Sequence, residues 1–206
     1  MEPFEIQSEE KLFHRLQQGD TTAFMELYAK HRDQVFRFAC RVLGSQDHAE
    51  DVTHDCFLAL MRNSGTFDSQ RGTLRSYLLA TARNLCLKKM RRSKFEHSVE
   101  NPVESSSPQD GPLGHMLDRE ISSKVRSAIT RLPVSEREVL VLFEYEGLSV
   151  REISRIIGRN QALVKWYLHQ ARVRLRRELA PFLNGGLNCV KEDKCNVARK
   201  TQWTRD

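Results

Sequence analysis

Apolar residues along this chain recur mainly at intervals of three and four, a spacing that places them on one face of an α-helix. A clear example runs through Phe24, Leu27, Val35, Ala39 and Val42. No stretch shows sustained alternation of apolar and polar residues, the pattern typical of a half-buried β-strand. The hydrophobic pattern therefore predicts an all-α fold.

Several helices are predicted in the first half of the chain, each after a residue whose side chain can accept hydrogen bonds from the first turn. The first two helices are predicted to end at Gly19 and Gly44. Glu50 completes a capping box for the third helix, and the fourth runs to Lys94. The capping residues are Ser8, Asp20, Asp47 and Thr73.

A polar segment, residues 96–115, separates this half of the chain from the second. It contains several prolines and glycines and the run from Ser105 to Ser107, with almost no apolar residues. This composition favours a flexible linker, because it cannot bury enough apolar surface to fold. We therefore expect two small helical domains, residues 8–95 and 116–180, followed by a tail of residues 181–206.

The second domain is predicted to contain a helix-turn-helix. Beyond a helix from Met116 to Arg131, two capping boxes begin further helices, and Asn160 can cap a last helix that Pro181 stops near Leu179. A short helix, a glycine turn and a longer helix form the build of a DNA-reading pair. The boxes pair Ser135 with Glu138 and Ser149 with Glu152, and the glycines that end helices are Gly147 and Gly158.

The last helix combines an apolar stripe with a polar face. The stripe consists of Val164, Leu168, Ala171, Leu175 and Leu179. The basic residues just before this helix, Arg151, Arg155 and Arg159, are expected to hold backbone phosphates. The candidates for duplex contact on the last helix are Asn160, Gln161, Lys165, Trp166, His169, Gln170, Arg172 and Arg176, with base edges read between Gln161 and His169. An alternative for Trp166 is packing against the neighbouring helices.

Positive charge is concentrated in two segments of the chain, whose net charge is +6. Residues 71–94 carry 8 basic and no acidic side chains, and residues 147–180 carry 8 basic and 2 acidic ones. In contrast, residues 1–70 carry 7 basic and 12 acidic side chains, and residues 95–146 carry 5 and 10. A surface that served solubility alone would mix the two signs, so these two basic islands predict two phosphate-binding faces.

The cysteines and the hydropathy indicate a reducing, aqueous compartment. Cys40, Cys56 and Cys86 fall in helical patterns, where a buried thiol acts as a small hydrophobe. Cys189 and Cys195 lie in the tail at a spacing that fits neither a redox nor a zinc motif. No apolar run approaches the roughly 20 residues that a membrane span needs. We expect a cytoplasmic protein with no membrane insertion, no metal and no cofactor.

Together these motifs resemble the bacterial extracytoplasmic-function sigma factors of the sigma-seventy family. The first domain is similar to their region two in Ala23 to Val42, Ala49 to Phe57, and Thr73 to Arg92, which includes Ala82-Arg83-Asn84. The second domain is similar to their region four in Arg131-Leu132-Pro133, Glu146 to Ser149, Ile153 to Gly158, and Val164 to Arg172.

The resemblance implies a non-enzymatic factor that gives core RNA polymerase its specificity for promoter DNA. The helix matching Asp47 to Arg62 would dock on a coiled coil of the largest polymerase subunit through Glu50, Asp51, His54 and Asp55. The loop and basic helix beyond it would open the minus-ten element and hold a flipped base of the non-template strand. The residues that would do so are Phe67, Arg71, Arg75, Tyr77, Arg83, Asn84 and Lys88, with core packing as the alternative role of Tyr77.

Region four of the family binds the minus-thirty-five element. Here the family's common Gly-Thr-Val-Lys-Ser-Arg is replaced by Ala162 to Tyr167, so the usual minus-thirty-five sequence is not implied. Tyr77 stands where the family often has Trp, which keeps an aromatic ring with a polar group. Two domains on a tether also imply a possible anti-sigma factor that clamps them together. The tail lies outside the resemblance.

Two other functions remain as alternatives. A stand-alone helix-turn-helix regulator would explain residues 116–180 but would leave the basic helix of the first domain without a task. A helical His-Asp metal phosphohydrolase is suggested by His31, His48 and the pair His54-Asp55. The last two residues are adjacent, so on a helix they point about 100° apart, which is unfavourable for binding one metal ion.

Overall fold

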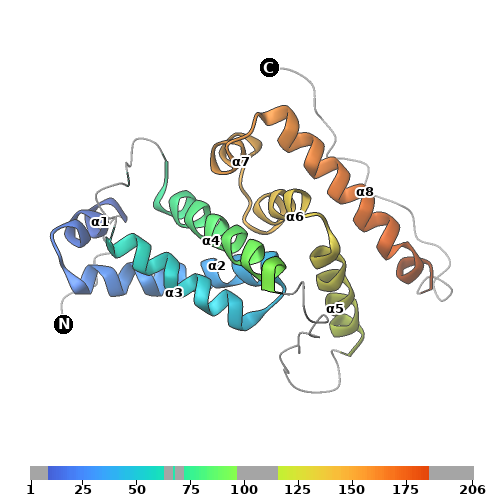
Figure 1. Ribbon diagram of the computed structural model, residues 1–206, viewed down its shortest axis with the longest axis horizontal. Helices are drawn as coiled ribbons and strands as arrows, with labels where there is room; N and C mark the ends of the chain where they lie inside the picture. Colours follow the sequence, from blue (N-terminus) through green and yellow to red (C-terminus); the bar gives the residue numbers. More distant parts are fainter. Residues whose placement is uncertain (1–8, 63–66, 68–71, 97–115, 186–206) are drawn as a thin grey trace, which may run out of the picture.

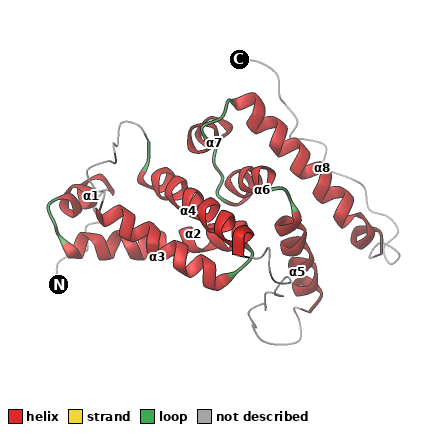
Figure 2. Cartoon of the chain, viewed as in Figure 1, coloured by secondary structure: helices red, strands yellow, loops and turns green. Residues whose placement is uncertain are grey.

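The computed structural model describes residues 9–62, 67, 72–96 and 116–185 (Figure 1). Figure 2 shows that the described residues are helices joined by loops, with no strand among them, which confirms the all-α fold. The helices are α1 (Glu9–Gln17), α2 (Thr21–Leu43), α3 (Gln46–Arg62), α4 (Leu74–Glu96), α5 (Met116–Arg131), α6 (Val134–Leu140), the π-helix η2 (Val141–Tyr145), α7 (Val150–Ile157) and α8 (Gln161–Gly185).

Of the caps predicted for the first half, those at Asp20 and Thr73 are present, and Ser8 lies outside the described residues. The Asp20 carboxylate accepts hydrogen bonds from the backbone N–H groups of Thr22 and Ala23 at 2.9 and 3.4 Å, and Thr73 accepts one from Ser76 at 3.2 Å. The cap predicted for α3 is wrong. Since α3 begins at Gln46, Asp47 lies inside its first turn, and the hydroxyl of Ser45 accepts the bond from the N–H of His48 at 3.4 Å.

In the second half, the boundaries of the helix-turn-helix follow the prediction. Ser149 and Glu152 form both halves of a capping box, and Asn160 accepts a hydrogen bond from the N–H of Leu163 at 2.8 Å. The box predicted at Ser135 is wrong. Since α6 begins at Val134 with Pro133 at the N-cap position, Ser135 already lies inside the first turn and makes no cap.

The last helix continues past Pro181, contrary to the predicted stop near Leu179. A proline inside a helix removes one backbone hydrogen bond and crowds the preceding turn. Side chains of α8 on both sides of Pro181 contact α5. Arg131 pairs with Glu178 at 2.6 Å, and the Lys124 ammonium lies 4.3 Å from the centre of the Phe182 ring. Packing against α5 therefore holds α8 together where the local sequence disfavours it.

Each half of the chain forms a helical bundle, and the two bundles lie against each other (Figure 1). We call α1–α4 the first module and α5–α8 the second. Phe38, Phe57 and Leu60 are fully buried in the first, and Leu142 and Ile153 in the second. The buried apolar residues form one continuous cluster through both modules. The contact runs from α4 to α7 and from α2 to α5, α6 and η2.

Candidate nucleic-acid interface

Burial divides α8 into an inner stripe and an outer face. Val164 and Ala171 are fully buried and Leu168 is 6% exposed, while Leu175 and Leu179 are partly covered. The side chains opposite this stripe point into solvent. We call them the recognition face: Gln161, Lys165, Trp166, His169, Arg172 and Arg176, with Gln170 half-buried at its border.

The turn before α8 fixes the direction of this face. Gly158 adopts a left-handed conformation with φ 66°, and the Ser154 hydroxyl donates to the carbonyl of Arg159 at 2.5 Å. Arg151, Arg155 and Arg159 are all exposed, and the side chain of Asn160 caps the helix. The free N–H groups of a helix N-terminus favour anions such as phosphate, which is the contact that a recognition helix offers at its start.

Two side chains of the recognition face already have partners. Arg172 pairs with Glu144 at 2.6 Å and lies over the ring of Phe143, 5.3 Å from its centre. About half of each charged side chain is exposed, so the pair contributes little stability and a phosphate can replace the carboxylate. Trp166 is 51% exposed and meets Tyr167 edge to face at 5.3 Å, which holds its indole ring outward. The exposure of Trp166 favours contact with a ligand over core packing.

In the first module, α3 presents the four predicted polymerase-binding residues on one exposed face. We call Glu50, Asp51, His54 and Asp55 the α3 docking face. Asp51 forms an ion pair with Lys89 of α4, and the hydrogen bond to this ammonium lowers the pKa of Asp51. Met61, 47% exposed and about two helical turns beyond His54, extends the face with an apolar side chain that was not singled out from the sequence. An exposed methionine beside charged residues is typical of a protein interface.

The minus-ten candidates divide into three groups. Phe67 packs edge to face on Phe13 and Tyr77, with ring centres 4.7 and 5.5 Å away, so the two candidate aromatics form one partly buried row. Asn84 and Lys88 are exposed one turn apart on α4. Arg75 and Arg83 pair with acidic residues of the second module, described below. Arg71 lies outside the described residues.

The acidic partners of Arg75 and Arg83 were not predicted from the sequence. Glu138 binds the guanidinium of Arg83 through both carboxylate oxygens, at 2.8 and 3.0 Å, and Arg75 lies 3.6 Å from the carboxylate of Glu146. One signal in the sequence was available for Glu138, which directly precedes the apolar run of residues 139–143, because a buried carboxylate seldom lacks a partner.

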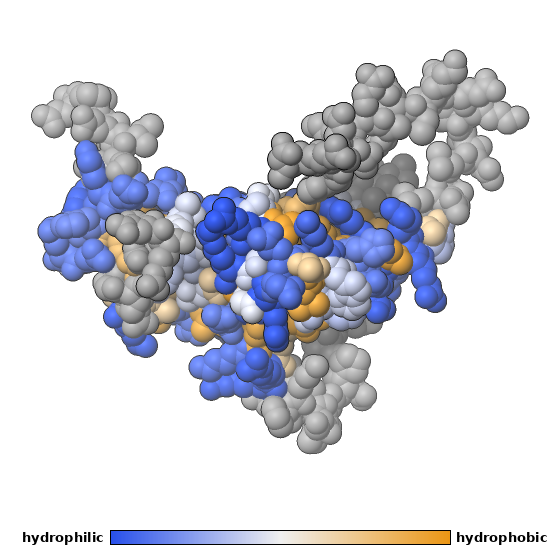
Figure 3. Space-filling model, turned by 90° about the horizontal axis from the view of Figure 1, so that it is seen from above, coloured by the Kyte–Doolittle hydropathy of each residue, from blue (hydrophilic) through white to orange (hydrophobic). Residues whose placement is uncertain are grey.

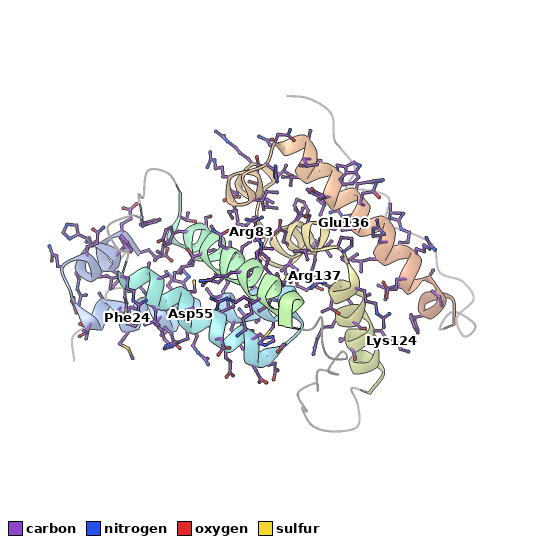
Figure 4. All side chains as sticks on the ribbon, in the orientation of Figure 1. Phe24, Asp55, Arg83, Lys124, Glu136 and Arg137 are labelled. Carbon is purple, nitrogen blue, oxygen red and sulfur yellow. The ribbon has the colours of Figure 1, made fainter. Side chains whose placement is uncertain are left out.

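The groups that suggested a metal enzyme have other roles here. His31 is 4% exposed, and burial lowers its pKa. His54 and Asp55 are exposed on α3, where Figure 4 labels Asp55. Burial raises the pKa of the Cys56 and Cys86 thiols to about 12, as expected for cysteines that act as small apolar side chains. Within the described part of the chain, no group of three or more His, Cys, Asp or Glu is arranged to hold a metal ion. There, too, no helix is long and apolar enough to cross a membrane.

Solved structures share this arrangement of helices. One is the sigma factor RpoE of Bartonella quintana in complex with the anti-sigma factor NepR, with a TM-score of 0.65 and 22% identity over 76% of this chain and 96% of that one. Another is CnrH in complex with the cytosolic domain of CnrY, with a TM-score of 0.60 and 22% identity over 86% and 98% of the two chains. At these identities the comparison establishes the fold.

Sequence comparison identifies the family. Residues 27–96 match the family model of Sigma-70 region 2, and residues 122–175 match that of Sigma-70, region 4. The chain is 30% identical to the ECF RNA polymerase sigma factor BldN of Streptomyces coelicolor, over 83% of this chain and 65% of that protein, somewhat less than two thirds of its length. It is 31% identical to the ECF sigma factor SigM of Mycobacterium tuberculosis, over 82% and 83% of the two chains. The chain therefore belongs to the extracytoplasmic-function sigma factors of the sigma-70 family.

Proposed function

We propose that this sigma factor directs core RNA polymerase to promoter DNA through two contacts, one on each module. The observation that carries the proposal is the recognition face of α8. Its polar and basic side chains are exposed on the second helix of a fully capped helix-turn-helix, while the opposite side of that helix is buried. This is the geometry with which such a helix enters the major groove.

In the proposed upstream contact, the recognition face reads the minus-thirty-five element. Arg151, Arg155 and Arg159 hold phosphates at the entrance of the groove, which fixes the position of the module without reading sequence. The base edges are read from the first turns of α8, where Gln161, Lys165 and Trp166 lie exposed. Since Trp166 and Tyr167 stand where the family commonly has Ser and Arg, the preferred sequence differs from the usual one.

In the proposed downstream contact, the first module opens the minus-ten element. Asn84 and Lys88 lie exposed on α4, and the aromatic row of Phe67 and Tyr77 lies at its N-terminal end. An aromatic ring and an amide can hold a base outside the duplex, where its edge becomes readable. The α3 docking face meanwhile binds the polymerase and leaves α4 to the DNA.

The proposal places this factor in the cytoplasm, where core polymerase and promoter DNA are found. An anti-sigma factor is a further proposed partner, since the solved RpoE structure described above is a complex of a sigma factor with an anti-sigma factor. Such a partner would control how much of the factor reaches polymerase.

Reconstitution with core polymerase tests the proposal. The chain should co-purify with the core enzyme and start run-off transcription from promoters mapped after its overexpression. Replacing both Asp51 and Asp55 with Lys should abolish co-purification while leaving duplex binding by the isolated chain unchanged. A chain that binds duplex DNA but neither co-purifies nor starts transcription would instead be a stand-alone regulator.

A further inference from the structure

The charged contacts between the two modules centre on a pair of glutamates of the second module, Glu138 and Glu146, which we call the acidic latch. Glu138, on α6, accepts hydrogen bonds from the Nε and Nη2 atoms along one edge of the Arg83 guanidinium, at 2.8 and 3.0 Å, while Nη1 donates to the side-chain oxygen of Asn84 at 3.2 Å. Only 15% of the Arg83 side chain and 6% of the Glu138 side chain are exposed. Figure 4 shows Arg83 where α4 meets the second module. A bidentate contact shielded from water is the strongest form of an arginine–carboxylate ion pair.

Glu146, just after η2, contacts the first module from three directions. Its carboxylate accepts a hydrogen bond from Gln34 of α2 at 2.7 Å and lies 3.6 Å from Arg75 of α4 and 3.9 Å from Arg41 of α2. Arg75 also donates to the backbone carbonyl of Glu146, and the Arg41 guanidinium covers the Tyr145 ring at 4.3 Å. The Glu146 side chain is 5% exposed, so its charge depends on these partners.

A third contact joins helix ends across the same boundary. Arg137 of α6 donates to the carbonyl of Val42 in the last turn of α2 at 2.6 Å, and to the carbonyls of Thr130 and Leu132 at the end of α5. The carbonyls at a helix C-terminus attract positive charge, so one guanidinium caps a helix from each module. Burial lowers the pKa of Arg137, which has no carboxylate partner among these contacts.

We propose that the acidic latch holds the free factor in a closed state, in which Glu138 and Glu146 occupy the arginines that bind promoter DNA in the open state. This inference rests on the proposed function, because it takes Arg75 and Arg83 as DNA-binding residues. The Nε–Nη2 edge of Arg83 cannot bind a phosphate in the same bidentate way while it binds Glu138, and Nη1 is bound to Asn84. Closure and downstream DNA binding therefore exclude each other.

The composition of the boundary explains why the latch can open. A buried ion pair recovers in attraction roughly what desolvation of its two charges costs, so exchanging the glutamates for phosphates changes the free energy little, whereas removing the glutamates alone leaves buried arginine charges unpaired and destabilises the closed state. Opening returns both glutamates to water and frees the arginines for phosphates. The α3 docking face stays exposed in the closed state, so polymerase can bind before the latch opens.

The first experiment neutralises the latch without changing its shape. The Glu138→Gln, Glu146→Gln double variant should bind a fluorescent single-stranded oligodeoxynucleotide of mixed sequence at least about threefold more tightly than the natural chain, since less of the protein is closed. Small-angle scattering should report a larger radius of gyration. Glu178→Gln is the matched control, because Glu178 pairs with Arg131 inside the second module. Equal affinity and equal radius in all three proteins, with unchanged helicity, would overturn the latch.

The second experiment reverses the charges of the Arg83–Glu138 ion pair and measures only whether the chain is closed. Glu138→Arg should expand the chain, and adding Arg83→Glu should restore the compact radius, because the reversed pair can form again. A double variant as expanded as the single one would contradict the latch. If neither the natural chain nor any variant binds the oligonucleotide, the proposed function fails, while the scattering still decides whether the latch exists.

Discussion

At the scale of single residues, the exposed fraction of a side chain on α8 distinguishes a ligand-binding residue from a core residue better than its chemical type does. Leu168 and Trp166 are both large and apolar, yet Leu168 is 6% exposed and Trp166 is 51% exposed. The three-and-four spacing predicted the buried stripe, because a helix places those positions together. The spacing could not decide the role of Trp166, because that role depends on whether the neighbouring helices cover its side chain.

A test of Trp166 follows from the one apolar group that a base pair presents in the major groove, the methyl group of thymine. The natural factor should bind its minus-thirty-five element about fourfold less tightly when a contacted thymine is replaced by deoxyuridine, the effect of about one buried methyl group. Trp166→Ala should lose this preference, measured by fluorescence anisotropy. Phe182→Ala, which removes another half-exposed aromatic of α8, serves as the control. A methyl preference that survives Trp166→Ala would contradict the contact.

Arg172 and Arg176 should contribute charge to the upstream contact. Replacing both with Ala should weaken duplex binding and flatten its dependence on salt, because each lost phosphate contact reduces the slope by about 0.9. The measurement is a titration of binding against salt concentration. Arg131→Ala removes a positive charge from the same module away from this face and should leave the slope unchanged. An unaltered slope in the double variant would count against these two residues.

Asn84 should act at a later step, in promoter opening. Asn84→Ala should leave the closed complex intact and reduce permanganate reactivity of the minus-ten thymines, because the flipped base loses an amide partner. A template that already contains an unpaired minus-ten bubble should restore transcription. If the variant opens duplex promoters as well as the natural factor does, Asn84 has no such role.

At the scale of helices, local capping chemistry predicted most boundaries, and tertiary contacts decided the exceptions. Asp20, Ser149 and Asn160 cap as expected, because each bond spans only two or three residues. Ser135 lies inside α6 and so cannot form its predicted box with Glu138, whose carboxylate binds Arg83 of the other module instead. Contacts with α5 likewise carry α8 past Pro181. A pattern read along one segment contains no information about such distant partners.

The end of α2 offers a test of the boundary between modules. Gly44 and Gly158 both have positive φ angles, 75° and 66°, so an alanine at either is strained by about 1 to 3 kcal/mol. Only at Gly44 would the new methyl group meet a neighbour, the Cγ2 atom of Thr130 at 2.9 Å. Gly44→Ala should therefore lower the thermal midpoint more than Gly158→Ala does.

Thr130→Ser provides the control, because it removes the Cγ2 atom and keeps the hydroxyl that donates to the carbonyl of Ser127. In that background the two alanine variants should melt at similar temperatures. An equal effect of both glycine substitutions in the natural chain would mean that α2 and α5 do not meet closely in solution.

At the scale of the whole molecule, charge patterning predicted two basic helical surfaces but not their shared boundary. Figure 3 shows one face of the molecule largely covered by polar residues, with apolar patches toward its right-hand part. No charged partner was predicted from the sequence for the acidic side chains of residues 95–146. Two of these side chains instead neutralise Arg75 and Arg83, so part of the first basic island faces protein in the closed state. The fold places these residues next to each other although they are far apart in sequence, so the pairs could not be predicted from local patterns.

Footprinting of the promoter by hydroxyl radicals, with the factor bound to core polymerase, tests the central claim that this chain makes two separate DNA contacts. The expected result is protection at the minus-thirty-five and minus-ten elements, with Arg172→Ala plus Arg176→Ala weakening only the upstream site. Protection of a single site, or loss of both sites together in that variant, would contradict it.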